Sequence, residues 1–126
     1  MYRVIVAGSR SVCDEHLIFS KLDKLLSNKM DQDDIQIVSG TARGVDQAGE
    51  RYAASRGLDC VRFPADWEKY GRRAGYLRNC QMAENADALV AFWDGQSRGT
   101  KHMIEIAKAR GLAVRIVTCI SKERLE

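Results

Sequence analysis

Short apolar runs, most of which stop at a glycine or proline, alternate with stretches of helical periodicity along almost the whole chain. We predict strands at Val4–Ala7, Ile35–Val38, Cys60–Phe63, Ala88–Trp93 and Val114–Val117. Helices are predicted over 14–28, from Val45 to Gly57, up to about Asn85, and from about Thr100 to Gly111, whereas residues 65–73 are predicted to be irregular. Strands that alternate with helices indicate right-handed crossovers and a parallel sheet covered on both faces.

The sequence therefore predicts an α/β fold, a three-layer, doubly wound sheet of about five parallel strands in the order 3-2-1-4-5. The 126 residues suffice for one domain, predicted to span residues 1–120 and to be followed by a polar tail over 121–126. In such sheets a ligand binds beyond the carboxyl ends of the strands, where the strand order reverses. That position lies between the first and fourth strands.

Three loops at this predicted edge each combine glycine, a hydroxyl residue and arginine. They are Gly8-Ser9-Arg10, Ser39-Gly40-Thr41-Ala42-Arg43-Gly44-Val45-Asp46 and Asp94-Gly95-Gln96-Ser97-Arg98-Gly99-Thr100. Glycine lets backbone N–H groups approach an anion, a helix N-terminus adds further donors, and arginine binds phosphate bidentately. Any one such loop is explained as well by helix capping. Three of them at one edge favour a phosphate-binding site.

The familiar nucleotide and hydrolase fingerprints are absent. The sequence contains no GxGxxG after the first strand, no GxxxxGK[ST] and no GxSxG, which argues against an ordinary dehydrogenase, a P-loop nucleotidase and an α/β-hydrolase. We therefore expect a nucleotide that is held in another way.

The segment from Phe63 to Asn79 gathers four aromatic residues and three arginines around a helix start. Trp67 or Tyr70 can stack on a base. The favoured interpretation for both is that they seal the helix against the sheet or form a subunit contact. Arg78 and Asn79 are better functional candidates, because asparagine is disfavoured inside a helix and needs a reason to be there. The full set of predicted ligand-binding residues is Gly8, Ser9, Arg10, Ser39, Gly40, Thr41, Ala42, Arg43, Gly44, Asp46, Arg78, Asn79, Asp94, Gly95, Ser97, Arg98, Gly99 and Thr100.

Charge and cysteine usage narrow the functional classes. A net charge of +3 argues against nucleic-acid binding by bulk charge. A set of arginines nevertheless falls near the predicted edge and predicts one concentrated anion pocket: Arg10, Arg43, Arg72, Arg73, Arg78 and Arg98. The four dispersed cysteines (Cys13, Cys60, Cys80 and Cys119) and two separate histidines predict reduced thiols and no metal site. No apolar run resembles a signal peptide or a membrane span, so we expect a cytoplasmic protein.

Four motifs together resemble the SLOG superfamily, in particular its small branch in bacteria and phages. They are Val4–Arg10, Ser39–Asp46, Arg78–Met82 and Asp94–Thr100, and the resemblance extends from Tyr2 to Val117. The Ser39–Asp46 turn is similar to that of the DNA-processing DprA proteins. The last turn and Arg78 are similar to the GGxGT and arginine elements of the LOG phosphoribohydrolases. The resemblance implies a Rossmann-like fold, a nucleotide-derived ligand at these loops, and frequent dimers.

One position departs from the LOG pattern. LOG enzymes carry a glutamate three residues after the threonine of GGxGT, and this chain has Met103 there. Glu105 lies about 200° further round the helix and cannot take its place. The catalytic residues are therefore unknown; Asp46, Asp94 and Arg78 are the candidates, and helix capping is the favoured role for both aspartates.

Three functions remain open. The first is a module that binds a nucleotide or NAD-derived molecule as a sensor or sink, with no other cofactor. The second is a phosphoribohydrolase-like enzyme that releases a base from a nucleotide. The third, binding of single-stranded nucleic acid, is disfavoured by the mild charge. The aromatic and arginine-rich segment also predicts self-association as a homo-oligomer.

Overall fold

Five parallel strands form one sheet in the order β3-β2-β1-β4-β5, as predicted. The computed structural model describes residues 1–11, 14–30 and 34–119. The strands are β1 (Tyr2–Gly8), β2 (Ile35–Ser39), β3 (Asp59–Arg62), β4 (Ala88–Trp93) and β5 (Ala113–Thr118). The helices are α1 (Glu15–Met30), α2 (Val45–Arg56), α3 (Trp67–Tyr70), α4 (Ala74–Glu84) and α5 (Arg98–Ala109), with a 3-10 turn η1 (Gly71–Arg73) between α3 and α4. The predicted tail and Cys13 lie outside the described residues.

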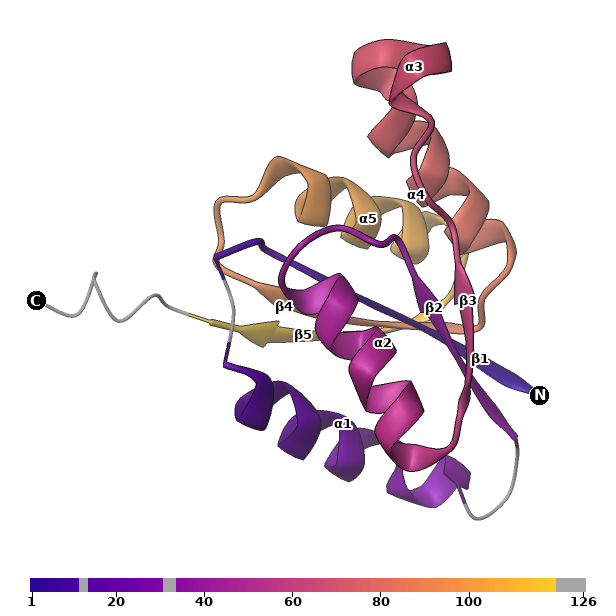
Figure 1. The fold of residues 1–126 in the computed structure, drawn as a ribbon, viewed down its shortest axis with the longest axis vertical. Helices are drawn as coiled ribbons and strands as arrows, with labels where there is room; N and C mark the ends of the chain where they lie inside the picture. Colours follow the sequence, from indigo (N-terminus) through magenta and orange to yellow (C-terminus); the bar gives the residue numbers. More distant parts are fainter. Residues whose placement is uncertain (12–13, 31–33, 120–126) are drawn as a thin grey trace, which may run out of the picture.

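Alternate residues of the central strand face opposite layers. Val4 and Val6 pack in a cluster with the apolar faces of α1 and α2, whereas Ile5 and Ala7 pack with α4 and α5. Figure 1 shows the two helix pairs on opposite sides of the sheet. Because both faces are covered, the interior strands are almost wholly buried, and β4 is apolar throughout.

The segment 65–73 is more ordered than predicted. Asp66 caps α3 by accepting a hydrogen bond from the N–H of Lys69 (3.1 Å), and η1 continues the chain into α4. A single helical turn carries no periodicity, so the sequence pattern could not show it. The segment projects beyond the body of the domain (Figure 1). Trp67 and Tyr70 are 55% and 40% exposed, so the prediction that they seal the helix against the sheet is wrong, and the subunit contact stays a prediction.

The strand register brings the predicted loops to one edge. Gly8 is the last residue of β1 and pairs with Phe92 of β4, and the N–H of Ser9 donates to the Phe92 carbonyl (3.0 Å). On the other side of β1, Ser39 ends β2 and its carbonyl accepts from the N–H of Phe63 (2.8 Å). The carboxyl ends of β1, β2 and β4 are therefore adjacent. No helix in the described part of the chain is long and apolar enough to cross a membrane.

Candidate functional site

A cavity of about 540 Å³ opens at this edge, between the ends of β1 and β4 and the α3–α4 segment. Eleven of the predicted ligand-binding residues line it: Gly8, Ser9, Arg10, Ala42, Asp46, Arg78, Asn79, Asp94, Ser97, Gly99 and Thr100. The other seven do not: Ser39, Gly40, Thr41, Arg43, Gly44, Gly95 and Arg98. All three loops and α4 thus contribute to one cavity at the strand-order switch.

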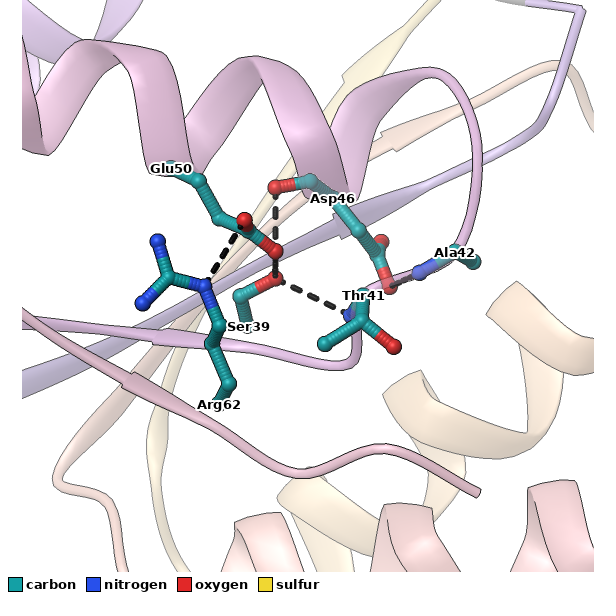
Figure 2. A network of polar contacts seen from close by, with 6 residues as sticks. All are labelled: Ser39, Thr41, Ala42, Asp46, Glu50 and Arg62. Atoms are coloured by element: carbon teal, nitrogen blue, oxygen red, sulfur yellow. Dashed lines mark hydrogen bonds and ion pairs between the residues drawn. The ribbon is translucent and has the colours of Figure 1, made fainter. Parts of the chain in front are cut away.

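A polar network links the loop between β2 and α2 to residues of α2 and β3 (Figure 2). The Ser39 hydroxyl donates to Glu50 (2.7 Å) and accepts from the backbone N–H of Thr41 (3.0 Å). Glu50 in turn pairs with Arg62 of β3 (2.9 Å). Ser39 is fully buried, so its predicted contact with a ligand is replaced by a role in shaping the loop.

Thr41 has the one positive φ of a non-glycine residue among the described positions, at 65°. A β-branched residue is strained in this left-handed conformation. The hydrogen bond from its N–H to Ser39 offsets part of that strain. The loop is therefore fixed in a conformation that the local sequence alone does not favour.

Arg78 of α4 lines the cavity and contacts this loop. Its Nη1 donates to the Gly40 carbonyl, and its Nε donates to the side-chain oxygen of Asn79 (3.1 Å). Burial lowers the pKa of Arg78, although the nearby Asp46 carboxylate opposes the change. A guanidinium has five N–H donors, so Arg78 retains donors for an anion in the cavity.

Asp46 is the second residue of α2 and does not cap it. The N-cap position belongs to Gly44, which forms no side-chain cap, so the capping role predicted for Asp46 is wrong. Its Oδ2 instead accepts from the N–H of Ala42 in the preceding loop (3.2 Å). The side chain is buried, and this burial raises the pKa of Asp46 to about 6, against the opposing effects of the Ala42 amide and Arg78.

Asp46→Asn is expected to stabilise the protein at neutral pH. The folded-state pKa of about 6 lies above the ordinary value of 3.8, so the stability associated with the protonated carboxyl is complete below about pH 4 and is lost as the pH rises through 6. The difference between these two pKa values corresponds to a loss of about 3 kcal/mol at most in the free energy of unfolding between pH 4 and pH 8. Urea unfolding should show Asp46→Asn more stable than wild type by about 1–3 kcal/mol at pH 8, with the gap closing at pH 4. An equal gap at both pH values would contradict this assignment.

Asp94 organises the third loop. Its Oδ1 accepts from the N–H groups of Gln96 (2.8 Å) and Ser97 (2.9 Å), and its Oδ2 accepts from the Ser11 hydroxyl (3.1 Å). These bonds, the two amides first, lower the pKa of Asp94 to about 2. The N-cap of α5 is Ser97, which accepts from the N–H of Thr100. Asp94 therefore shapes the turn before the helix and stays ionised.

Asn79 joins α4 to α5. Its amide donates to the Gly99 carbonyl (3.3 Å) and contacts Nδ1 of His102 (3.2 Å), whose ring meets Tyr76 edge to face. Sequence reasoning gave no role to His102 or Glu50, because neither lies in a loop motif and only the folded chain places them beside the site. Met82 and Met103 form an apolar part of the cavity wall.

Of the six arginines predicted near the edge, Arg10, Arg72 and Arg78 line the cavity. The other three are exposed and do not line it: Arg43 in the loop before α2, Arg73 at the end of η1 and Arg98 at the start of α5. Among the described residues, no three or more His, Cys, Asp or Glu side chains are arranged to hold a metal ion, and Cys60, Cys80 and Cys119 are free thiols. The polar chemistry of the described cavity is thus that of arginines, hydroxyls, amides and two aspartates.

Comparison with known proteins identifies the family and supports the fold. The model of the YspA, cpYpsA-related SLOG family matches residues 2–70. The Gene 61 protein of Mycobacterium phage D29 is 35% identical over 121 residues, which cover 90% of this chain and 94% of that protein. The solved structure of DNA processing protein A (DprA) from Streptococcus pneumoniae has the same fold, with a TM-score of 0.67 at 19% identity; 91% of this chain matches about half (49%) of DprA. The chain therefore belongs to the YspA, cpYpsA-related SLOG family.

Proposed function

We propose that the protein binds a nucleotide or NAD-derived molecule in the cavity at the carboxyl edge of the sheet, as a sensor or sink. The observation that carries the proposal is the set of three arginines, Arg10, Arg72 and Arg78, around one cavity. Arginine is suited to phosphate because its planar guanidinium forms bidentate, charge-assisted hydrogen bonds.

Two further features support a phosphorylated ligand. The N-terminal turn of α5 reaches the cavity through Ser97, Gly99 and Thr100, and free N–H groups at a helix N-terminus attract anions. The exposed ring of Trp67 lines the same cavity, where it can stack on a base.

Thermal unfolding with AMP, ADP-ribose and ribose 5-phosphate tests the proposal. A ligand present at 100 times its Kd should add about 2.7 kcal/mol to the free energy of unfolding. Arg10→Ala should weaken binding about 10-fold, because it removes a charge-assisted hydrogen bond from an exposed side chain. Arg115→Ala, which removes an exposed arginine from β5, is the charge-matched control and should leave affinity unchanged.

The same incubations separate binding from turnover. Chromatography of the mixtures should recover intact nucleotide, because the cavity holds Met103 where LOG enzymes carry glutamate. Release of free base would instead favour the phosphoribohydrolase alternative. Absence of stabilisation by all three compounds would contradict the proposed function.

A further inference from the structure

Asp46 is a buried acid whose position folding alone does not explain. It is 5% exposed, it lines the cavity, and it does not cap its own helix. None of the ion pairs among the described residues includes it. Burying a carboxylate without an ion pair is unfavourable, so a residue of this kind points to a role in binding.

The charge of Arg78 attracts the Asp46 carboxylate, but the two side chains, both among the described residues, do not form an ion pair. A Cβ placed on Gly40 would stand 2.8 Å from both Nη1 of Arg78 and Oδ2 of Asp46, so both groups flank the Gly40 backbone. The negative charge of Glu50, on the same helix, disfavours the ionised form of Asp46, whereas hydrogen bonds from the Ala42 and Gly8 amides favour it. Glu50 is itself committed to Ser39 and Arg62.

The second acid of the cavity provides a contrast. Both oxygens of Asp94 are used: Oδ1 accepts from Gln96 and Ser97, and Oδ2 accepts from Ser11. Asp46 accepts from Ala42 through Oδ2, and an ionised carboxylate has about four acceptor positions. With the Gly8 amide included, Asp46 accepts fewer hydrogen bonds than Asp94 and has more acceptor capacity left for a ligand, whereas the arginines can only donate.

A ligand group that faces Asp46 must donate hydrogen bonds, because a phosphate there would be repelled. One of the proposed phosphate-binding features, the N-terminus of α5, lies away from Asp46, because α5 follows β4. Asp46 follows β2, and β1 separates the two strands, so the loops stand about 10 Å apart at two inter-strand spacings. A ribose with a 5′-phosphate can bridge such a span when a hydrogen bond of about 2.8 Å is added at each end.

We propose that Asp46 determines the sugar specificity of the site: its carboxylate accepts hydrogen bonds from the vicinal 2′- and 3′-hydroxyls of a ribonucleotide. This inference rests on the proposed function and narrows its ligand to nucleotides with an intact ribose diol. Phosphate then lies toward α5, and the base lies toward Trp67 at the rim.

Calorimetric titration of AMP and 2′,3′-dideoxy-AMP into wild type and Asp46→Asn tests the inference. Wild type should prefer AMP by about 10-fold or more, the effect of losing hydrogen bonds to a charged group. Asp46→Asn should bind the two compounds within about threefold of each other. Asp59→Asn, an exposed aspartate at the amino end of β3, is the matched control and should keep the wild-type preference.

The outcomes separate the inference from the proposed function. Equal binding of AMP and its dideoxy analogue by wild type, or an unchanged preference in Asp46→Asn, would overturn the sugar-specificity role and leave nucleotide binding intact. Failure of AMP to bind wild type would overturn the inference. The proposed function would then be tested by whether ADP-ribose binds. If Asp46→Asn does not fold, titration of wild type with 2′-deoxy-AMP and 3′-deoxy-AMP decides, and each should bind more weakly than AMP.

Discussion

Gly8→Ala is expected to lower the free energy of unfolding by about 3 kcal/mol or more. A Cβ on Gly8 would stand 2.3 Å from the carbonyl oxygen of Phe92 and 2.6 Å from Cγ2 of Val45. The carbonyl belongs to the backbone of β4 and already accepts from the N–H of Ser9, so it cannot move without disturbing the sheet. Urea unfolding followed by circular dichroism measures the loss.

Gly99→Ala is the matched control. Nothing lies within 4 Å of a Cβ at Gly99, which sits in the first turn of α5. Its free energy of unfolding should stay within about 0.5 kcal/mol of wild type. A Gly8→Ala protein as stable as this control would show that β4 and α2 accommodate the methyl group, and the steric explanation would be wrong.

Arg78→Ala should weaken AMP binding by about 100-fold, the largest effect on affinity that we expect. Its guanidinium is half-buried, lines the cavity and donates to the Gly40 carbonyl and to Asn79, so its removal takes away both a proposed donor to the ligand and the support of the loop. Arg78→Lys should lose nearly as much, because an ammonium cannot reproduce the planar fork. Calorimetric titration gives both affinities.

Arg73→Ala controls for the loss of one positive charge. Arg73 lies close to Arg78 in sequence but is exposed and does not line the cavity, so its removal should change AMP affinity less than threefold. Binding by Arg78→Ala within threefold of wild type would contradict the central place of Arg78 in the site.

Most of the site's location was predictable because it depends on strand order. Once the chain is divided into alternating strands and helices, parallel pairing places every strand-to-helix loop at one edge of the sheet, and the strand order makes the loops after β1, β2 and β4 neighbours. This reasoning predicts that Gly8, Arg10 and Thr100 lie at the same edge, and all three line the cavity. Arg78 and Asn79 were found differently, as polar residues that a helix interior does not favour.

The role of each polar residue was much less predictable. Ser39 and Asp46 belong to one sequence motif, yet Ser39 is turned away toward Glu50 while Asp46 lines the cavity. Both aspartates precede or begin helices, and capping was the natural expectation for both. Neither is the N-cap of its helix, because Gly44 and Ser97 hold those positions. Asp46 accepts from Ala42 in the loop before α2, and Asp94 accepts from Gln96 and Ser97 in the turn before α5.

The sequence by itself predicted the parallel sheet, its strand order and the edge where the loops meet. The alternation of strands and helices is a local property of the sequence, and the rules for crossovers between parallel strands leave few possible arrangements. The tertiary structure alone decided which side chains share the cavity and how each is charged. Burial raises the pKa of Asp46 while backbone amides lower that of Asp94. Asp46 is desolvated by elements distant in sequence, which meet only in the folded chain. The amides on Asp94 belong to Gln96 and Ser97, two and three residues further along the chain, and they point at the carboxylate only because the turn is folded in this way.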